Sequence, residues 1–320
     1  MRKGKIILLA CYCFFISAGG LLFAESVSQD DPVPPNVQVL LGKLFSPRER
    51  ARMNAALKLG DYSHPLVIDN LIHVVAEDSS ETVRRVAIRS LGNTSSPAAF
   101  KTILKAVESE SIGIKMEAMG AAVNFSTPAV RGILLAEAAS PNPMVRQKAV
   151  AYLGKLKQNN ELVINKLVES LDDISEGVRV AACRVLAGKK YEVSLDKLVS
   201  VLSDDRSDIV RENAAAAVTN IGGKKAENSL NAALEDGSPS VRIKAAEGLA
   251  LMGSKSGLNE AIQGIKSSDA RVRIAACNII GLTGGRKNRI FLEQALGDYD
   301  RRVQRAAMEA LKKLDERVGG

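Results

Sequence analysis

Positively charged residues recur along this chain at intervals of 31 to 33 residues, each directly after an apolar residue that is usually valine. Aspartate recurs in register with them, six residues earlier, in five copies. Two kinds of chemistry fit such columns: the cations bind an anionic partner, or they pair with the carboxylates inside the fold. The first column is Arg52, Arg84, Lys115, Arg146, Arg179, Arg211, Arg242 and Arg273, ending in Gln304, and the second is Asp78, Asp173, Asp205, Asp236 and Asp298.

Residue types that catalyse reactions or hold metals are few. The two histidines, His64 and His73, are nine residues apart and would lie on opposite sides of one helix, which disfavours a shared metal site. No further histidine is present to act as the base for a serine or cysteine nucleophile. Cys183 and Cys277 occupy the same position of a repeat, three copies apart, which is too far for a disulfide. We therefore predict that the protein is not an enzyme and uses no metal or cofactor.

The regular spacing comes from an internal repeat of about 31 residues. Counted from the apolar residue before each cation as position 0, nine copies cover residues 37–315. Positions 0, 4, 5 and 8 share one face of a helix, and position 4 is alanine in every copy. An alanine at the centre of that face indicates a helix backbone packed close to it. The nine alanines are Ala55, Ala87, Ala118, Ala149, Ala182, Ala214, Ala245, Ala276 and Ala307.

Each copy is predicted to form two helices joined by a short turn. Three residues before position 0, eight of the nine copies carry Ser, Asn or Asp, whose side chains accept hydrogen bonds from the first N–H groups of a helix. Pro143 and Pro239 follow this cap directly, at the first helical position, where proline is favoured. A second apolar-periodic stretch lies upstream of each cap, and no strand pattern is evident. The predicted fold class is all-α: a solenoid of about nine stacked helix-turn-helix units.

Phrases such as Asp173 to Ala187 and Asp236 to Ala250 follow the pattern D-x-x-x-x-V-R-x-x-A-A-x-x-L-G. This pattern resembles the HEAT-repeat family, in particular the short HEAT-like variant also found in phycobilisome lyases. The resemblance covers nearly all of the chain after its N-terminal segment. It implies a right-handed α-solenoid and a ladder of Asp–Arg pairs, and it is more specific for the fold than for the function.

The position of the cations on the helix favours pairing within the fold over binding of an anion. Position 1 lies at about 100° on the helix, inside a buried arc that runs from 0° to about 140°. An arginine there has to reach along a partly buried seam and find partners. The aspartate column stands in the turn before each second helix, so a ladder between neighbouring turns would satisfy both columns. This interpretation predicts that Arg179→Ala lowers stability markedly, since it strands a buried carboxylate.

Positions 2 and 6 of the second helices form the expected open, concave face. Basic residues stand early in this set and acidic ones late, without a continuous Lys/Arg track and without aromatic side chains for stacking bases, so nucleic acid is disfavoured as a partner. Its apolar members either anchor a partner protein or pack on the adjacent repeat. The candidate partner surface is Arg85, Arg89, Met116, Gln147, Val180, Arg184, Glu212, Ile243, Glu247, Ile274 and Asn278.

The N-terminus has the pattern of a secretory signal peptide over residues 1–24. Three basic residues precede an apolar run from Ile6 to Ala24, and polar Glu25 follows. An uncleaved membrane anchor is an alternative, because the run can just span a bilayer. Leu8 to Cys11 resembles a lipoprotein signal, but the apolar run continues past it. Residues 25–36 hold three prolines and are predicted to be a flexible linker, and residues 316–320 a C-terminal tail.

These observations favour an exported protein of the bacterial periplasm or cell envelope. We expect a scaffold or adaptor that binds a partner protein along the concave face of the solenoid, without catalysis and without a membrane contact beyond the N-terminal segment. Two alternatives come from the resemblance. One is a tetrapyrrole lyase or chaperone-like enzyme, which the export signal opposes. The other is a solenoid that binds nucleic acid, which the modest net charge and the absence of Trp oppose.

Overall fold

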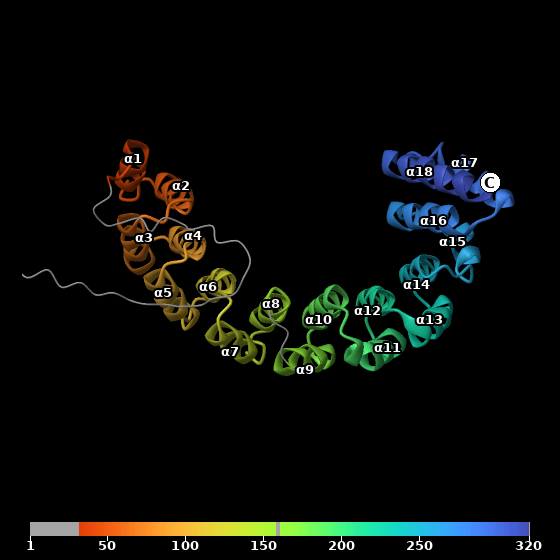
Figure 1. Cartoon of the computed structure of the whole chain (residues 1–320), viewed down its shortest axis with the longest axis horizontal. Helices are drawn as coiled ribbons and strands as arrows, with labels where there is room; N and C mark the ends of the chain where they lie inside the picture. The colour runs from red at the N-terminus through yellow and green to blue at the C-terminus, as the bar shows by residue number, and fades with distance from the viewer. Residues whose placement is uncertain (1–31, 158–160, 320) are drawn as a thin grey trace, which may run out of the picture.

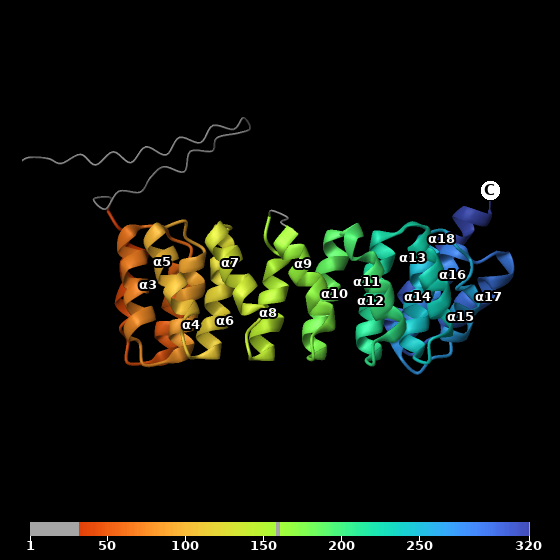
Figure 2. The same ribbon diagram turned by 90° about the horizontal axis from the view of Figure 1, so that it is seen from below.

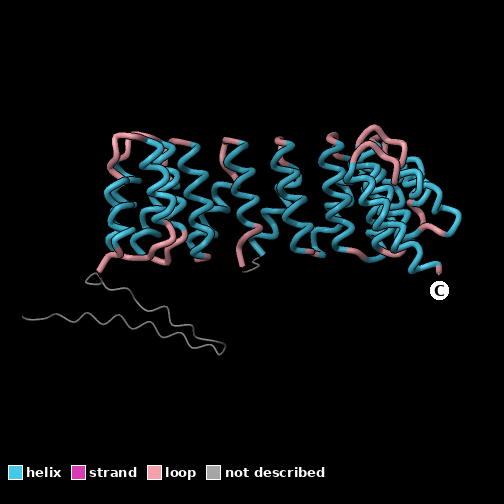
Figure 3. The backbone as a smooth tube through the Cα atoms, turned by 90° about the horizontal axis from the view of Figure 1, so that it is seen from above, coloured by secondary structure: helices cyan, strands magenta, loops and turns pink. Residues whose placement is uncertain are grey.

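The computed structural model describes residues 32–157 and 161–319, and within them the helices follow one another in an open arc (Figure 1). Each unit contributes two helices. The even-numbered helices line the concave side of the arc and the odd-numbered helices form its convex side (Figure 1). Seen at right angles, the helices stand side by side with their turns gathered along two edges (Figures 2 and 3). The described residues thus form an all-helical solenoid without a strand.

The first helices of the nine units are α1 Pro35–Lys43, α3 Pro65–Glu77, α5 Pro97–Val107, α7 Pro128–Glu137, α9 Glu161–Glu169, α11 Leu195–Asp204, α13 Gly223–Ala232, α15 Leu258–Gly264 and α17 Arg289–Ala295. The second helices are α2 Glu49–Leu59, α4 Glu81–Gly92, α6 Ile112–Ala122, α8 Pro143–Leu153, α10 Glu176–Lys189, α12 Asp208–Ile221, α14 Pro239–Leu251, α16 Ala270–Thr283 and α18 Arg301–Val318. Short 3-10 turns cover Val123–Phe125, Ser170–Asp172, Glu192–Ser194, Ala233–Glu235 and Arg286–Asn288.

The second helices begin where the sequence predicted a cap. At six of these starts, the side chain accepts a hydrogen bond from a backbone N–H of the first turn, which replaces a partner that the helix itself cannot supply. Ser175 and Ser238 have the same extended backbone but make no such bond, and Arg48 caps α2 only through its backbone. The six capping residues are Ser80, Ser111, Asn142, Ser207, Asp269 and Asp300.

The buried apolar residues form two clusters along the solenoid, a long one from Val37 to Leu249 and a shorter one from Ile243 to Leu314. All nine alanines at position 4 are buried to 1% exposure or less. Successive second helices also pack against each other, and the residues at two of these contacts are a glycine of one helix and an alanine of the next. A Cβ added to Gly92 would lie 2.7 Å from the Cβ of Ala121, and one added to Gly281 would lie 2.8 Å from the Cα of Ala310. Small residues at these crossings therefore set how closely successive concave helices pack.

The helices extend beyond the predicted bounds of 37–315 at both ends. α1 begins at Pro35, inside the predicted linker, because a proline at the first helical position needs no N–H partner. α18 continues to Val318, inside the predicted tail. Its last turn is held because Arg286 Nη2 donates to the carbonyl of Val318 at 2.9 Å and Arg317 donates to the carbonyl of Gly284. The predicted signal peptide lies outside the described residues, among which no helix is both long and apolar enough to cross a membrane.

Candidate interaction surface

Five arginines of the concave helices each form an ion pair with an aspartate in the turn of the next unit. In every pair, Nε and Nη2 of the guanidinium donate to the two carboxylate oxygens, which is the geometry of a strong charge-assisted contact. These pairs join each turn to its neighbour along one edge of the solenoid. The pairs and their shortest distances are Arg52–Asp78 2.7 Å, Arg146–Asp173 2.8 Å, Arg179–Asp205 2.7 Å, Arg211–Asp236 2.8 Å and Arg273–Asp298 2.7 Å.

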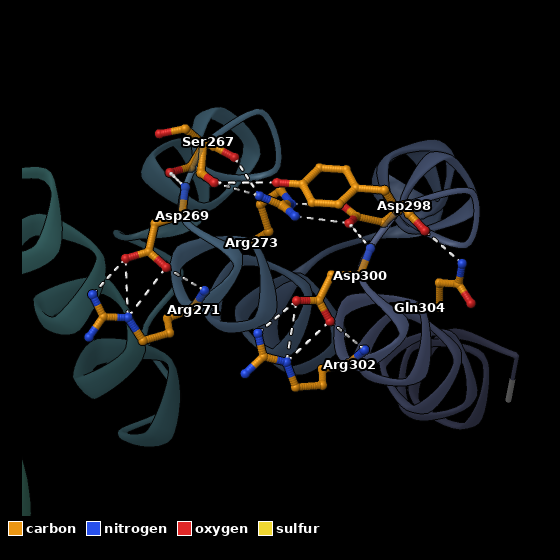
Figure 4. Close-up of polar contacts among 10 residues, drawn as sticks. Ser267, Asp269, Arg271, Arg273, Asp298, Asp300, Arg302 and Gln304 are labelled. Atoms are coloured by element: carbon orange, nitrogen blue, oxygen red, sulfur yellow. Dashed lines mark hydrogen bonds and ion pairs between the residues drawn. The ribbon is translucent and has the colours of Figure 1, made fainter.

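Each ladder arginine also binds the turn of its own unit. Figure 4 shows the last ion pair, where Arg273 lies between the Asp298 carboxylate and the backbone carbonyl of Ser267, 2.8 Å from Nη1. The Tyr299 ring covers this guanidinium with its centroid 4.5 Å away. Asp298 in turn accepts a hydrogen bond from the backbone N–H of Asp300 at 2.9 Å. One guanidinium therefore fixes two successive turns, and its donors are used within the fold.

Four members of the cation column depart from this geometry. Arg84 donates only to the backbone carbonyl of Asp78, because the next turn has Ser109 where the aspartate would stand. Arg242 faces Ser267 in the same way and binds a glutamate of the following first helix. Lys115 also binds a glutamate of the following first helix. Gln304 donates to the backbone carbonyl of Asp298. The two replacement pairs are Lys115–Glu137 and Arg242–Glu260, both at 3.0 Å.

Burial and pairing act on the ladder carboxylates in opposite directions. The hydrogen bond from Arg146 lowers the pKa of Asp173 and outweighs the effect of burial. Burial raises the pKa of Asp205, but the bonds from Arg179 and from the Ser207 N–H together lower it below its usual value. Arg179 as a whole residue is 5% exposed. Both partners thus stay charged at neutral pH although little solvent reaches them.

The residues of the candidate partner surface lie on the concave helices, but not all of them are open to solvent. Gln147, Arg89 and Arg184 are exposed. Val180 and Ile243 are buried, at 9% and 5% exposure, so of the two alternatives for the apolar residues, packing within the solenoid applies to these two. Residues that are half-buried are Arg85, Met116, Glu212, Glu247, Ile274 and Asn278.

The reason for the two buried side chains lies in the stacking of units. Position 2 faces away from its own first helix, which suggested an open position. In the solenoid, however, it also faces the neighbouring unit. The Cδ1 of Ile243 lies 3.2 Å from where a Cβ on Gly264 of α15 would stand, so Ile243 packs into the following unit. Val180 belongs to the longer of the two hydrophobic clusters.

Positive charge on the concave side is neutralised in some units and not in others. Arg89 binds both carboxylate oxygens of Glu117 at 2.8 Å, and Arg85 lies 3.6 Å from the same carboxylate. On α14, Lys244 pairs with Glu247 at 2.7 Å. Between α8 and α10, in contrast, a groove of about 420 Å³ is lined by four cations and no acidic residue. The four cations are Lys148, Lys155, Arg184 and Lys189.

The candidate partner surface included three residues of this groove, Gln147, Val180 and Arg184, but of its four cations only Arg184, and it missed the three lysines. They stand at positions 3, 10 and 11, and only positions 2 and 6 were considered as the open face. A full helical wheel of the second helices would have shown them. The glycines at the C-terminal ends of α8 and α10, Gly154 and Gly188, were a second available signal, because both line the groove.

Cys183, Cys277 and His64 lie at positions where they contribute to the fold. Cys183 and Cys277 are buried free thiols, and burial raises their pKa to about 12 and about 11, respectively, which makes both poor nucleophiles. The sequence predicts His64 inside a helix, but in the structure it is the N-cap residue of α3. Its Nδ1 accepts a hydrogen bond from the backbone N–H of Leu66 at 3.1 Å. Among the described residues, no group of His, Cys, Asp and Glu is arranged to hold a metal ion.

Comparison with family models identifies the repeat. Five overlapping stretches match the model described as HEAT repeats, at residues 68–136, 100–187, 132–219, 195–263 and 226–312. Together they cover the chain without interruption from residue 68 to residue 312, which is well over half of its length. The chain belongs to the HEAT-repeat family. The turn ladder and the alanine positions described above are thus features of a HEAT-repeat solenoid.

Solved structures share this fold at low identity. E. coli YibA is 20% identical, with a TM-score of 0.58 over 83% of this chain and 97% of that one. A chain of Kap95p bound to RanGDP is 15% identical, with a TM-score of 0.60 over 87% of this chain and 45% of that one. A chain in a homology model of the AP-3 complex is 18% identical, with a TM-score of 0.60 over 83% of this chain and 55% of that one. No curated protein matches the chain.

Proposed function

We propose that this HEAT-repeat protein is a non-catalytic scaffold of the bacterial cell envelope that binds a partner protein along its concave face. The observation that carries the proposal is the division of polar groups between the two parts of the solenoid. The ladder arginines use their donors within the fold, whereas the concave helices leave cations between α8 and α10 without an acidic neighbour in the groove. Free charge on a rigid concave surface is available to a partner and not needed for folding.

The solenoid architecture supports a binding role. Stacked repeats present an extended curved surface whose side chains change from unit to unit while the scaffold stays constant. Solenoids of this fold are found in assemblies, as the Kap95p complex with RanGDP illustrates. The buried, high-pKa thiols and the capping role of His64 support a role without catalysis.

Site-specific photo-cross-linking tests this function. A photoreactive amino acid is placed at an exposed concave position, Gln147 of α8 or Arg89 of α4, and at Lys101 on convex α5 as a matched control. In cells of the source organism, we expect both concave positions to cross-link to the same one or two proteins, and the convex position not to. Equal cross-linking from both sides, or no protein adduct from either concave position, would contradict the proposal.

Export is the second part of the proposal and rests on the apolar run that follows the basic N-terminus. We expect the mature protein to begin at Glu25 and to be recovered with the periplasmic fraction. N-terminal sequencing of the protein purified from its own cells measures this directly. A retained Met1 in the membrane fraction would replace the signal peptide with an anchor, and a protein found in the cytosol would refute export.

A further inference from the structure

The groove between α8 and α10 is lined by four cations and by no acidic residue. Lys148 and Arg184 stand in the middle of their helices, and Lys155 and Lys189 at the C-terminal ends. Their contacts are with neutral groups. Arg184 Nε donates to Asn213 Oδ1 at 3.0 Å, and Lys189 Nζ donates to the carbonyl of Leu156 at 3.1 Å. The Lys155 ammonium lies 5.1 Å from the centroid of the Tyr152 ring.

Helix ends explain only part of this charge. The C-terminal carbonyls of a helix favour a nearby cation, which accounts for Lys189 in the last turn of α10 and for Lys155, two residues after the end of α8. Lys148 and Arg184 lie outside the last turns of α8 and α10 and gain no such benefit. Lys148 and Arg184 are exposed and line a groove that contains no carboxylate, so the fold supplies neither with an acidic partner there. Their charges are therefore available to a negatively charged occupant.

We infer that this groove binds an acidic segment of the partner protein, a short stretch of chain in which Asp or Glu side chains recur. This inference rests on the proposed function and specifies the chemistry of the partner. Ammonium and guanidinium groups recognise carboxylates through charge-assisted hydrogen bonds. Val185, which is half-buried, forms an apolar part of the same groove, against which the backbone and small side chains of such a segment pack.

The limited length of the positive region favours a peptide over a nucleic acid. Glu212 lies on the following concave helix, and on the preceding one the cation Arg89 is paired with Glu117. A polyanion with regularly spaced phosphates would therefore meet a carboxylate on one side of the groove and an already paired glutamate on the other. Binding of nucleic acid also gains from a continuous basic track and from several aromatic faces. A peptide with only a few acidic residues fits between the two glutamates.

Fluorescence anisotropy with a defined peptide tests the inference. The probe is a fluorescein-labelled decapeptide of alternating Glu and Gly, added to the chain purified from its own cells at 50 mM NaCl. We expect binding that the double variant K148E/R184E weakens at least 10-fold. The matched control K101E/K105E on convex α5 makes the same change in net charge and is expected to alter the affinity less than 2-fold. A Gln–Gly decapeptide should bind at least 10-fold more weakly than the Glu–Gly peptide.

Three results would overturn the inference: no binding of the Glu–Gly peptide, an equal loss in both double variants, or tighter binding of a labelled dT10 oligonucleotide. The variant K148Q/R184Q removes the charges without adding carboxylates, and is used if circular dichroism shows that the reversal lowers the helix content. The outcome is separable from the proposed function. If Gln147 and Arg89 still cross-link to a partner but the Glu–Gly peptide does not bind, the inference about the groove is refuted and the scaffold function stands. If the peptide binds but neither concave position cross-links to a protein, the scaffold function is refuted and the groove inference stands.

Discussion

Replacing Arg179 by alanine is expected to lower the free energy of unfolding by about 3–5 kcal/mol, the usual cost of removing one partner of a buried ion pair. The side chains of Arg179 and Asp205 are 6% and 8% exposed, so the remaining carboxylate would keep only the Ser207 N–H as a close donor. Urea unfolding, followed by circular dichroism, measures the change. An unchanged melting temperature would contradict the structural role of the ladder.

Arg84→Ala is the matched control for this variant. Arg84 occupies the same repeat position, but it makes a hydrogen bond to a backbone carbonyl and faces a serine in the next turn. Its removal strands no carboxylate, so we expect a loss of about 1 kcal/mol, the contribution of one hydrogen bond. The double variant R179A/D205A should be less destabilised than the sum of its single changes, because the second change removes the stranded charge.

The effect of Arg179→Ala should also change the shape of the unfolding curve. In a solenoid each unit contacts only its neighbours, so stability is a sum of units and of interfaces between them. Arg179 belongs to the interface between α10 and the turn before α12. Weakening that single interface separates the chain into two blocks that unfold at different urea concentrations. Arg84→Ala leaves this interface intact and should shift the transition without splitting it.

The fold could be predicted from the sequence because a repeat presents the same evidence nine times. One copy with a Val-Arg step and an alanine four residues after the valine is a weak signal, whereas nine copies at nearly equal spacing leave few other structures. The caps could be located for the same reason, since Ser80 and its equivalents stand three residues before the first buried position. The ends were less predictable because α1 and α18 have a neighbour on one side only. Their sequences therefore depart from the repeat.

The concave surface was predicted less well because a helical wheel describes one helix and not its neighbours. The wheel places Ile243 on the side away from its own first helix, and only the stack shows that α15 of the next unit covers it. The glutamates that replace a missing ladder aspartate were unpredictable for the same reason, because they come from a neighbouring helix. Glu260 reaches Arg242 from a different helix than the missing aspartate would, which the spacing of one column does not reveal.

The ladder and the groove divide the cations of this protein by the partners that the fold supplies. Where a carboxylate stands opposite, as for Arg179 and Arg89, the pair fixes the geometry of adjacent units or helices. Where only amide and carbonyl oxygens stand opposite, as for Arg184, the charge remains available. Net charge therefore describes the partner poorly, and the local balance between cations and acids along the concave helices describes it better.

Gly92→Ala is expected to destabilise the protein by about 1–3 kcal/mol, although alanine is intrinsically the better helix former by about 1 kcal/mol. Gly92 ends α4, where it crosses α6. The added Cβ would lie 2.7 Å from the Cβ of Ala121 and 2.9 Å from its Cα. Because one of these atoms is backbone, the clash is relieved only if the two helices move apart. That movement would loosen the contacts between both units.

Gly132→Ala provides the opposite expectation in the same protein. Gly132 lies inside α7 on the convex side, and an added Cβ meets no atom within 4 Å. The gain in helix propensity is therefore not offset, and we expect stabilisation by about 0.5–1 kcal/mol. Urea unfolding of both variants measures the contrast. If Gly92→Ala also stabilised the chain, the close crossing of α4 and α6 would not limit packing, and the small residues on the concave helices would need another explanation.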